Sequence, residues 1–157
     1  MKCGFFSDVH ANEEALLAVI KDFEAQKLDK INFLGDAVGY GASPNECVKL
    51  IQQVTSKTLM GNHDYASLGL LETDFFNQYA RESIIWTKNV LSDNTLDILS
   101  NYFLCFKWAD FHLVHSTPKE PENWHYILNL SDAEENFSFF EKRVCLIGNS
   151  HRPVIIK

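Results

Sequence analysis

The stretch Cys3-Gly4-Phe5-Phe6-Ser7-Asp8-Val9-His10 sets the pattern for this chain. Its first five residues form a short, mostly apolar run, which is typical of a buried β-strand. Two side chains that can bind metal ions, Asp8 and His10, follow where that strand would end. The stretch therefore predicts a strand that carries ligands at its carboxyl end.

Four further apolar runs repeat this arrangement. They span residues 30–34, 57–60, 111–114 and 144–147, and they are followed by Asp36, by Asn62 and His63, by His115, and by His151. In an open α/β sheet, parallel strands are buried and functional groups gather in the crevice outside their carboxyl ends. We therefore expect these distant residues to meet in a site for two metal ions.

Helical periodicity lies between the apolar runs. Residues 12–26 have a helical pattern with Asn12 as a cap, and a second helix begins near Pro44. These two strand and helix units imply a parallel sheet. A pair of helices covering the sheet is predicted between about residues 75 and 103, and the second of them starts at Ser92 or Asp93. An aromatic helix ending near Lys142, a strand around residues 105–108 and a closing strand at residues 154–156 complete the prediction.

Length and composition favour a single domain over residues 1–157, with 46% hydrophobic and 22% charged residues. The net charge of −7 disfavours nucleic acid as a partner, since a polynucleotide would be repelled. No stretch approaches the roughly 20 apolar residues that span a bilayer, and the amino terminus does not resemble a secretion signal. We expect a cytoplasmic protein that does not enter the membrane.

The four cysteines are Cys3, Cys47, Cys105 and Cys145, which are widely separated in the sequence. They form no closely spaced pair that would suggest a thiolate metal site. Buried, reduced thiols are the favoured interpretation.

Several short motifs occur in a characteristic order. They are Asp8-Val9-His10, Gly35-Asp36, Gly61-Asn62-His63-Asp64, a lone His115 after an apolar run, and Gly148-Asn149-Ser150-His151. In this order the chain resembles the calcineurin-like metallophosphoesterases, and its longer stretches resemble a branch of small bacterial and archaeal phosphodiesterases. The resemblance implies an α/β fold in which a layered sandwich of β-sheets is flanked by helices.

The resemblance also implies the metal ligands. One ion would be bound by Asp8, His10, Asp36 and His151, and the second by Asp36, Asn62 and His115. Asp36 would be shared, which suits two ions roughly 3.5 to 4 Å apart. Mn²⁺ is the expected metal, with Fe, Zn²⁺, Ni²⁺ or Mg²⁺ as alternatives.

The implied reaction is hydrolysis of a phosphate ester by a metal-activated water, without a covalent intermediate. His63 would protonate the leaving group as the general acid. Asp64 would orient the His63 imidazole or support its charged form.

The chain departs from the family pattern at two places. Asn149 stands where the family has the first histidine of a Gly-His-x-His motif, which would weaken the second metal site. Relatives also generally continue through further strands after this motif, so part of the second sheet is expected to be missing and an exposed edge would allow a second copy to associate. The alternative function is therefore a catalytically weakened or inactive relative that binds metal and acts as a scaffold or by binding a phosphorylated ligand.

Ordinary structural roles compete with these assignments. Asp8, Asp36 and Asp64 would each, taken alone, be read as turn or cap residues, and His112 and His125 are assigned to packing and to a loop. The 20 aromatic residues are mostly expected in the core. A smaller share of the weight goes to a stacking platform for a nucleoside, with the candidates Tyr40, Tyr65, Trp86, Trp124 and Tyr126.

Overall fold

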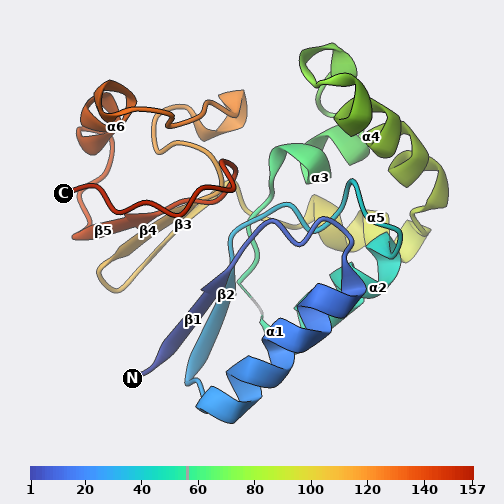
Figure 1. Cartoon of the computed structure of the whole chain (residues 1–157), viewed down its shortest axis with the longest axis horizontal. Helices are drawn as coiled ribbons and strands as arrows, with labels where there is room; N and C mark the ends of the chain where they lie inside the picture. Colours follow the sequence, from blue (N-terminus) through green and yellow to red (C-terminus); the bar gives the residue numbers. More distant parts are fainter. Residues whose placement is uncertain (56) are drawn as a thin grey trace.

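The computed structural model describes residues 1–55 and 57–157, which form a mixed α/β fold with two sheets (Figure 1). In the first sheet, β1 (Cys3–Phe6) pairs in parallel with β2 (Lys30–Phe33). In the second sheet, β4 (Phe111–Val114) lies between the antiparallel β3 (Cys105–Trp108) and the parallel β5 (Val144–Leu146). The predicted layered arrangement of sheets and helices is confirmed.

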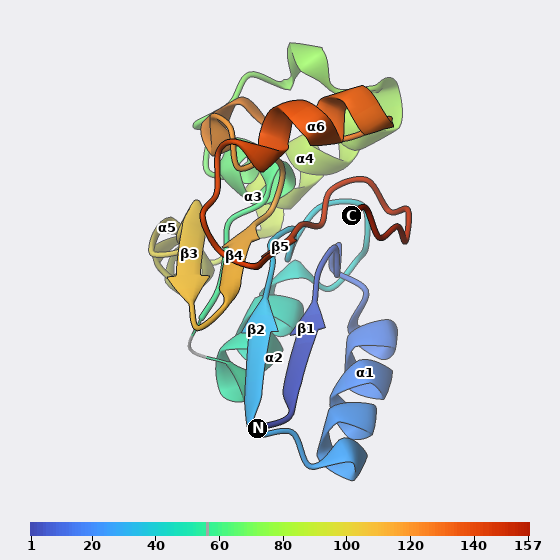
Figure 2. The same ribbon diagram turned by 90° about the vertical axis from the view of Figure 1, so that its left-hand side faces the viewer.

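The first sheet and its helices follow the sequence pattern closely. Helix α1 (Glu13–Gln26) begins after Asn12, whose side chain accepts a hydrogen bond from the backbone N–H of Ala15. Helix α2 (Pro44–Val54) has Pro44 in its first turn, where the missing N–H has no helical partner to lose. Both helices lie beside β1 and β2 (Figure 2).

The middle of the chain is helical. It contains α3 (Asn62–Ser67), α4 (Gln78–Val90) and α5 (Asp93–Ser100), with a 3-10 turn at Thr73–Phe75. Ser92 caps α5, as predicted, by accepting the N–H of Thr95. A second 3-10 turn at Pro121–Asn123 precedes α6 (Leu130–Phe137). Within the described residues, no helix is both long enough and apolar enough to cross a membrane.

Two apolar clusters stabilise this arrangement. The larger joins α1, β2 and α2 through buried side chains such as Leu16, Phe33 and Ile51. The smaller lies between the two sheets and centres on Leu34, Leu59 and Leu113. Burying each such side chain contributes about 1.5–3 kcal/mol, so the two sheets are fixed against each other and their carboxyl ends are brought together.

Three predicted elements differ from the structure. Residues 57–60 contribute only isolated bridges, from Thr58 to Phe33 and from Leu59 to Phe103, because too few residues pair to extend them. Residues 154–156 form no strand, and Ile155 is 85% exposed. The aromatic helix ends at Phe137 and does not reach Lys142.

The cysteine prediction is confirmed only in part. The cysteines are free thiols, and Cys47 is fully buried in α2. Cys105 is exposed and Cys3 and Cys145 are partly buried; all three lie in strands at the edge of their sheet, each paired with one described strand.

Candidate metal centre

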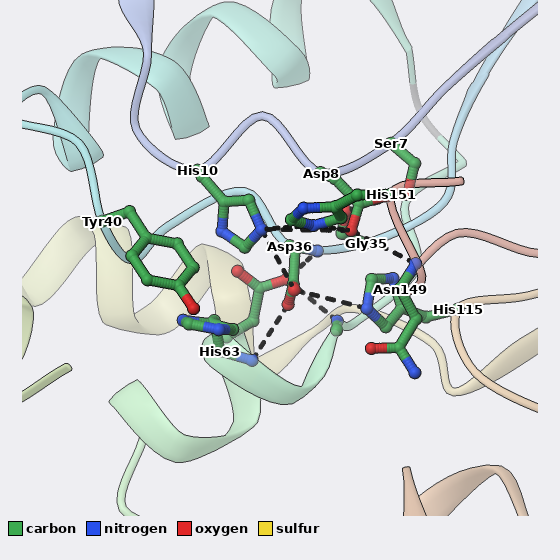
Figure 3. Close-up of polar contacts among 12 residues, drawn as sticks. Ser7, Asp8, His10, Gly35, Asp36, Tyr40, His63, His115, Asn149 and His151 are labelled. Carbon is green, nitrogen blue, oxygen red and sulfur yellow. Dashed lines mark hydrogen bonds and ion pairs between the residues drawn. The ribbon is translucent and has the colours of Figure 1, made fainter. Parts of the chain in front are cut away.

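The predicted ligands meet at the carboxyl ends of the strands (Figure 3). Asp8 follows β1, Asp36 follows β2, His115 follows β4, and His151 lies in the segment after β5. Three sets of side chains have ligand atoms within 4.8 Å of one another: Asp8, His10 and His151; His10, Asp36 and His63; and Asp8, Asp36 and His115. Shared members join the three sets into one cluster.

The loops that present these side chains are strained. Asp8, His10 and Asp36 have φ angles of 56°, 47° and 60°, in the left-handed region that non-glycine residues rarely adopt. Each such residue costs of order 1–3 kcal/mol, and such strain clusters at functional sites. Gly61 permits the close packing here, because a Cβ atom at that position would overlap the carboxylate and the backbone nitrogen of Asp36.

Asp36 lies at the centre of the cluster and is only 2% exposed. Its Oδ2 atom is 3.4 Å from Nε2 of His115 and 3.6 Å from Nε2 of His10. Its Oδ1 atom accepts the backbone N–H of His63 at 2.9 Å. Burial acts to raise the pKa of Asp36, but the charges of the surrounding imidazoles and the contact with His115 outweigh it, so the pKa lies below its ordinary value. The carboxylate is therefore charged and open to cations on two sides.

The backbone fixes two of the imidazoles in a ligand orientation. Nδ1 of His115 is 2.8 Å from the carbonyl oxygen of Leu34, and Nδ1 of His10 is 3.2 Å from that of Val38. An N–H at Nδ1 that donates to a carbonyl leaves the Nε2 lone pair free to bind a metal. In the protein without metal, burial lowers the pKa of His115, but Asp36 opposes this more strongly and raises the pKa to about 9.

The outer part of the cluster brings like groups together. Nε2 of His151 lies 3.2 Å from Oδ1 of Asp8 and 3.1 Å from Nε2 of His10. Two neutral imidazoles with lone pairs facing each other at this distance would repel, so the pair favours a proton or a cation between them. The side chain of His151 is 54% exposed, whereas that of His10 is 11% exposed.

Two asparagines complete the ring of donors. Oδ1 of Asn62 is buried and has no hydrogen-bond partner among the described residues, although a buried acceptor normally has one. Asn149 donates its backbone N–H to Oδ1 of Asp8 at 3.2 Å, and its side-chain Nδ2 to the carbonyl oxygen of His125 at 3.3 Å. Because Nδ2 makes this hydrogen bond, the amide oxygen of Asn149 remains available as a ligand for a cation.

This donor set fits divalent cations. The orphaned Asn62 oxygen, the buried His115 Nε2 without a hydrogen bond and two carboxylates supply the mixture of N and O ligands that such ions take. Bound there, the cations would satisfy groups that the described part of the protein leaves unpaired.

His63 is buried beside the cluster. Its ring lies 4.8 Å from that of His10 and 4.7 Å from that of Tyr40, measured between centroids. Its Nδ1 atom faces Gly39, where a Cβ atom would collide with the ring. Burial lowers the pKa of His63 to about 4, so the imidazole is neutral at neutral pH in the free protein.

Among the described residues, no hydrogen bond or ion pair joins the Asp64 carboxylate to the His63 ring, so the predicted orienting role of Asp64 stays a prediction. Its carboxylate instead accepts four backbone N–H groups, from Asp36 at 2.9 Å, Ala37 at 2.9 Å, Val38 at 3.1 Å and Gly61 at 3.0 Å. Consecutive residues of a helix do not face one another, and Asp64, in the first turn of α3, points back toward the loops. Its role is to hold the Asp36 loop against the start of α3.

A cavity of about 170 Å³ opens over the cluster. Three of its lining residues, Tyr40, Tyr126 and Ser150, were not among the predicted ligands or catalytic residues, although Tyr40 and Tyr126 were candidates for stacking. The position of Ser150 between Asn149 and His151 is the sequence signal that points to it. His112 is buried in β4 against the ring of Phe140, and His125 is exposed, as expected for residues outside the cluster.

Comparison with known proteins identifies the family of the chain. A model of the calcineurin-like phosphoesterase family matches residues 1–156. The chain belongs to this family. Its members are phosphoesterases that use divalent metals, and the described residues of this chain include groups that could hold such a metal.

Two relatives share substantial sequence with the chain. An uncharacterized protein of Methanocaldococcus jannaschii is 39% identical over 153 residues, covering 95% of this chain and 62% of that protein. The crystal structure of a metallophosphoesterase from Sphaerobacter thermophilus is 39% identical, with a TM-score of 0.83, over 96% of this chain and 61% of that one. The chain thus spans about three fifths of the length of these relatives.

A more distant structure shares the fold alone. A hypothetical protein of Pyrococcus horikoshii OT3 is only 17% identical, yet it matches with a TM-score of 0.82 over 97% of this chain and 70% of its own. The fold is therefore kept where most of the sequence has changed.

Proposed function

We propose that this protein hydrolyses phosphate esters at a site that holds two divalent cations, with Mn²⁺ as the expected metal. The observation that carries this proposal is the position of Asp36, whose carboxylate lies between Nε2 of His115 and Nε2 of His10. A buried carboxylate with imidazoles on two sides is suited to bridging two ions.

The surrounding residues divide into two ligand sets. Asp8, His10, Asp36 and His151 would hold one cation, and Asp36, Asn62, His115 and Asn149 the other. Such a pair of cations supplies charge neutralisation for the phosphoryl group and acidifies water near it. The protein contributes the spacing of the ligands, which follows from the strand ends and the strained loops.

His63 is the proposed proton donor to the leaving group. It lines the cavity next to Asp36, and a bound phosphate dianion would favour its charged form against the effect of burial. Asp64 supports the reaction indirectly, because its hydrogen bonds to residues 36–38 and 61 hold the bridging carboxylate in place.

Asn149 sets the character of the second cation site. An amide oxygen is neutral and harder than an imidazole nitrogen, so Mg²⁺ and Mn²⁺ should bind there with less loss of affinity than softer ions would. The hydrogen bond to the carbonyl of His125 orients the amide for this role.

The test is Mn²⁺-dependent hydrolysis of a chromogenic phosphodiester and a chromogenic phosphomonoester by purified, folded protein. Wild type is compared with Asp36→Ala, His63→Ala and Asn149→His, and with Asp74→Ala as a matched control, because Asp74 is an exposed residue in a surface ion pair with Arg81. We expect wild type and Asp74→Ala to turn over equally, well above Asp36→Ala and His63→Ala.

Two results would contradict the proposal. If wild type hydrolysed no faster than Asp36→Ala while Asn149→His became active, the second site would be too weak for catalysis and the protein would act by binding. If none of the variants was active with any divalent metal, phosphoester hydrolysis would be wrong for this chain.

A further inference from the structure

Two tyrosines line the cavity over the cluster of proposed metal ligands, and neither has a part in the proposed reaction. Tyr40 comes from the loop after β2, and Tyr126 comes from the segment between the second 3-10 turn and α6. Their exposed fractions are 47% and 48%. Each therefore leaves about half of its surface open to solvent, beside a cavity whose other lining residues are charged or polar.

Tyr40 is held in a strained backbone conformation. Its φ angle is 60°, a conformation that a bulky residue rarely adopts, and its N–H donates to the Ser83 hydroxyl of α4 at 3.1 Å. Its ring lies edge-on to that of His10, with centroids 4.9 Å apart, and also contacts that of His63 (Figure 3). A strained, anchored aromatic ring beside the reacting groups points to a role in the site.

Tyr126 lines both this cavity and a second cavity of about 260 Å³. The second cavity is lined by polar residues that include Thr117, Lys119 and Asp132. Because Tyr126 borders both cavities, its ring is placed to contact the part of a substrate that reaches beyond the phosphate.

We propose that the substrate carries an aromatic ring close to its phosphate, and that Tyr40 and Tyr126 bind this ring. This inference rests on the proposed function and names the class of ester that the site takes. Aromatic rings pair favourably with one another in offset or edge-to-face geometry, and flat rings stack on tyrosine largely irrespective of their substituents. A nucleoside is one group with such a ring and a polar part suited to the second cavity.

Tyr79 shows the contrasting case of a tyrosine without such a setting. It lies on α4 with 78% exposure and is not part of the lining of either cavity. Its replacement therefore provides a matched control.

The test measures binding by calorimetry to Mn²⁺-loaded protein. The probes are inorganic phosphate and three phosphonates: methylphosphonate, cyclohexylphosphonate and phenylphosphonate. The phosphonates have a carbon–phosphorus bond in place of the ester linkage, so a phosphoesterase does not cleave them during the measurement. We expect phenylphosphonate to bind about tenfold more tightly than methylphosphonate, and more tightly than the non-aromatic ring of similar size. Tyr40→Ala and Tyr126→Ala should remove this preference, whereas Tyr40→Phe, Tyr126→Phe and Tyr79→Ala should keep it.

The outcomes separate this inference from the proposed function. Equal affinity for the three phosphonates, together with clear binding of phosphate, would overturn the aromatic site and leave the proposed function standing. Loss of the preference in the Phe variants would also overturn it, since the hydroxyls would then be the recognised groups. Failure of inorganic phosphate and all phosphonates to bind would overturn both.

Discussion

The candidate site combines two regions that are built in different ways. The inner cluster, Asp36, Asn62 and His115, is at most 6% exposed and is held by hydrogen bonds to the backbone of neighbouring strands and loops. The outer loop, residues 147–157, has no regular secondary structure and carries Asn149 and His151. The fold alone fixes the inner cluster, whereas the outer loop depends on a few contacts.

Those few contacts can be named. The outer loop follows β5, a strand of three residues, and the N–H of Gly148 donates to the carbonyl of His115 at 2.9 Å. Gly148 also passes so close to Ser7 and Asp8 that a Cβ atom would collide with their side chains. The comparison teaches that the proposed bridging carboxylate, Asp36, is preorganised, whereas His151, the last proposed ligand of the first cation site, belongs to a segment held by few contacts.

The largest effect should come from removing the carboxylate that supports the inner cluster. Asp64→Ala would leave four buried backbone N–H groups without acceptors, so we expect the free energy of unfolding to fall by about 3 kcal/mol or more. Urea denaturation of the metal-free protein measures this. Asp74→Ala, which breaks an exposed ion pair, should change it by less than about 1 kcal/mol. Equal denaturation midpoints for the two variants would show that Asp64 does not hold the site together.

Metal affinity should distinguish the two regions next. We expect His115→Ala to weaken Mn²⁺ binding by about 100-fold or more, since this imidazole is fully buried and fixed by Leu34. His151→Ala should weaken it by about tenfold, because the exposed side chain can be replaced by water. Competition with a metal chelator measures both, with His125→Ala as the control. If His151→Ala lost more Mn²⁺ affinity than His115→Ala, the outer loop and not the inner cluster would dominate metal binding.

The pH dependence of metal binding should follow from His115. In the metal-free protein the pKa of His115 is about 9, so a cation must displace its proton at neutral pH. Mn²⁺ affinity should therefore rise by up to about tenfold per pH unit between pH 7 and 9 and then level off. His115→Ala should flatten the dependence of Mn²⁺ affinity on pH. If the dependence persisted in the variant, the proton displaced by the metal would come from another group.

The same shift predicts how the metal-free protein responds to alkali. The pKa of His115 in the folded state lies above its unfolded value. The protonated imidazole therefore stabilises the folded protein, and this contribution is fully present below about pH 6.5. It should be lost as the pH rises through about 9. A pH series of urea midpoints, taken with a chelator present, would show this fall, and Mn²⁺ should mask it.

The sequence predicts most of the inner cluster because its signals are local. Each ligand directly follows an apolar run, and such runs form buried strands whose ends share one edge. Asp8, Asp36 and His115 could therefore be placed near one another from strand order alone.

What the sequence does not reveal is decided by distant pairing and side-chain direction. Residues 57–60 and 154–156 have the composition of strands, yet pairing depends on neighbours that the run itself does not specify. Adjacency of His63 and Asp64 suggested that the two act together, but it could not reveal the four backbone N–H groups that the Asp64 carboxylate accepts. The second cavity forms between loop residues such as Thr117 and Tyr126 and the helix α6, so its existence depends on tertiary packing that the sequence pattern does not indicate.

Cysteine labelling gives the smallest effect and compares the mobility of the two regions directly. Burial raises the pKa of both Cys47 and Cys145 to about 12, so at pH 8 both react slowly with an alkylating reagent, and the fully buried Cys47 reacts only when its surroundings open. Cys145 lies in the short β5 that precedes the outer loop, whereas Cys47 is fully buried in α2. We expect Cys145 to label faster, as measured by mass spectrometry, with the exposed Cys105 as the rapid reference.

Mn²⁺ should slow the labelling of Cys145 by a few-fold and leave Cys105 unchanged, because a cation that joins Asp8 to His151 ties the outer loop to β1 and so favours the closed form of β5. A rate for Cys145 that is independent of metal would show that the outer loop is already fixed without it. Labelling of Cys47 as fast as Cys145 would show that the two regions open together, and the contrast between a preorganised cluster and a loosely held loop would then be wrong.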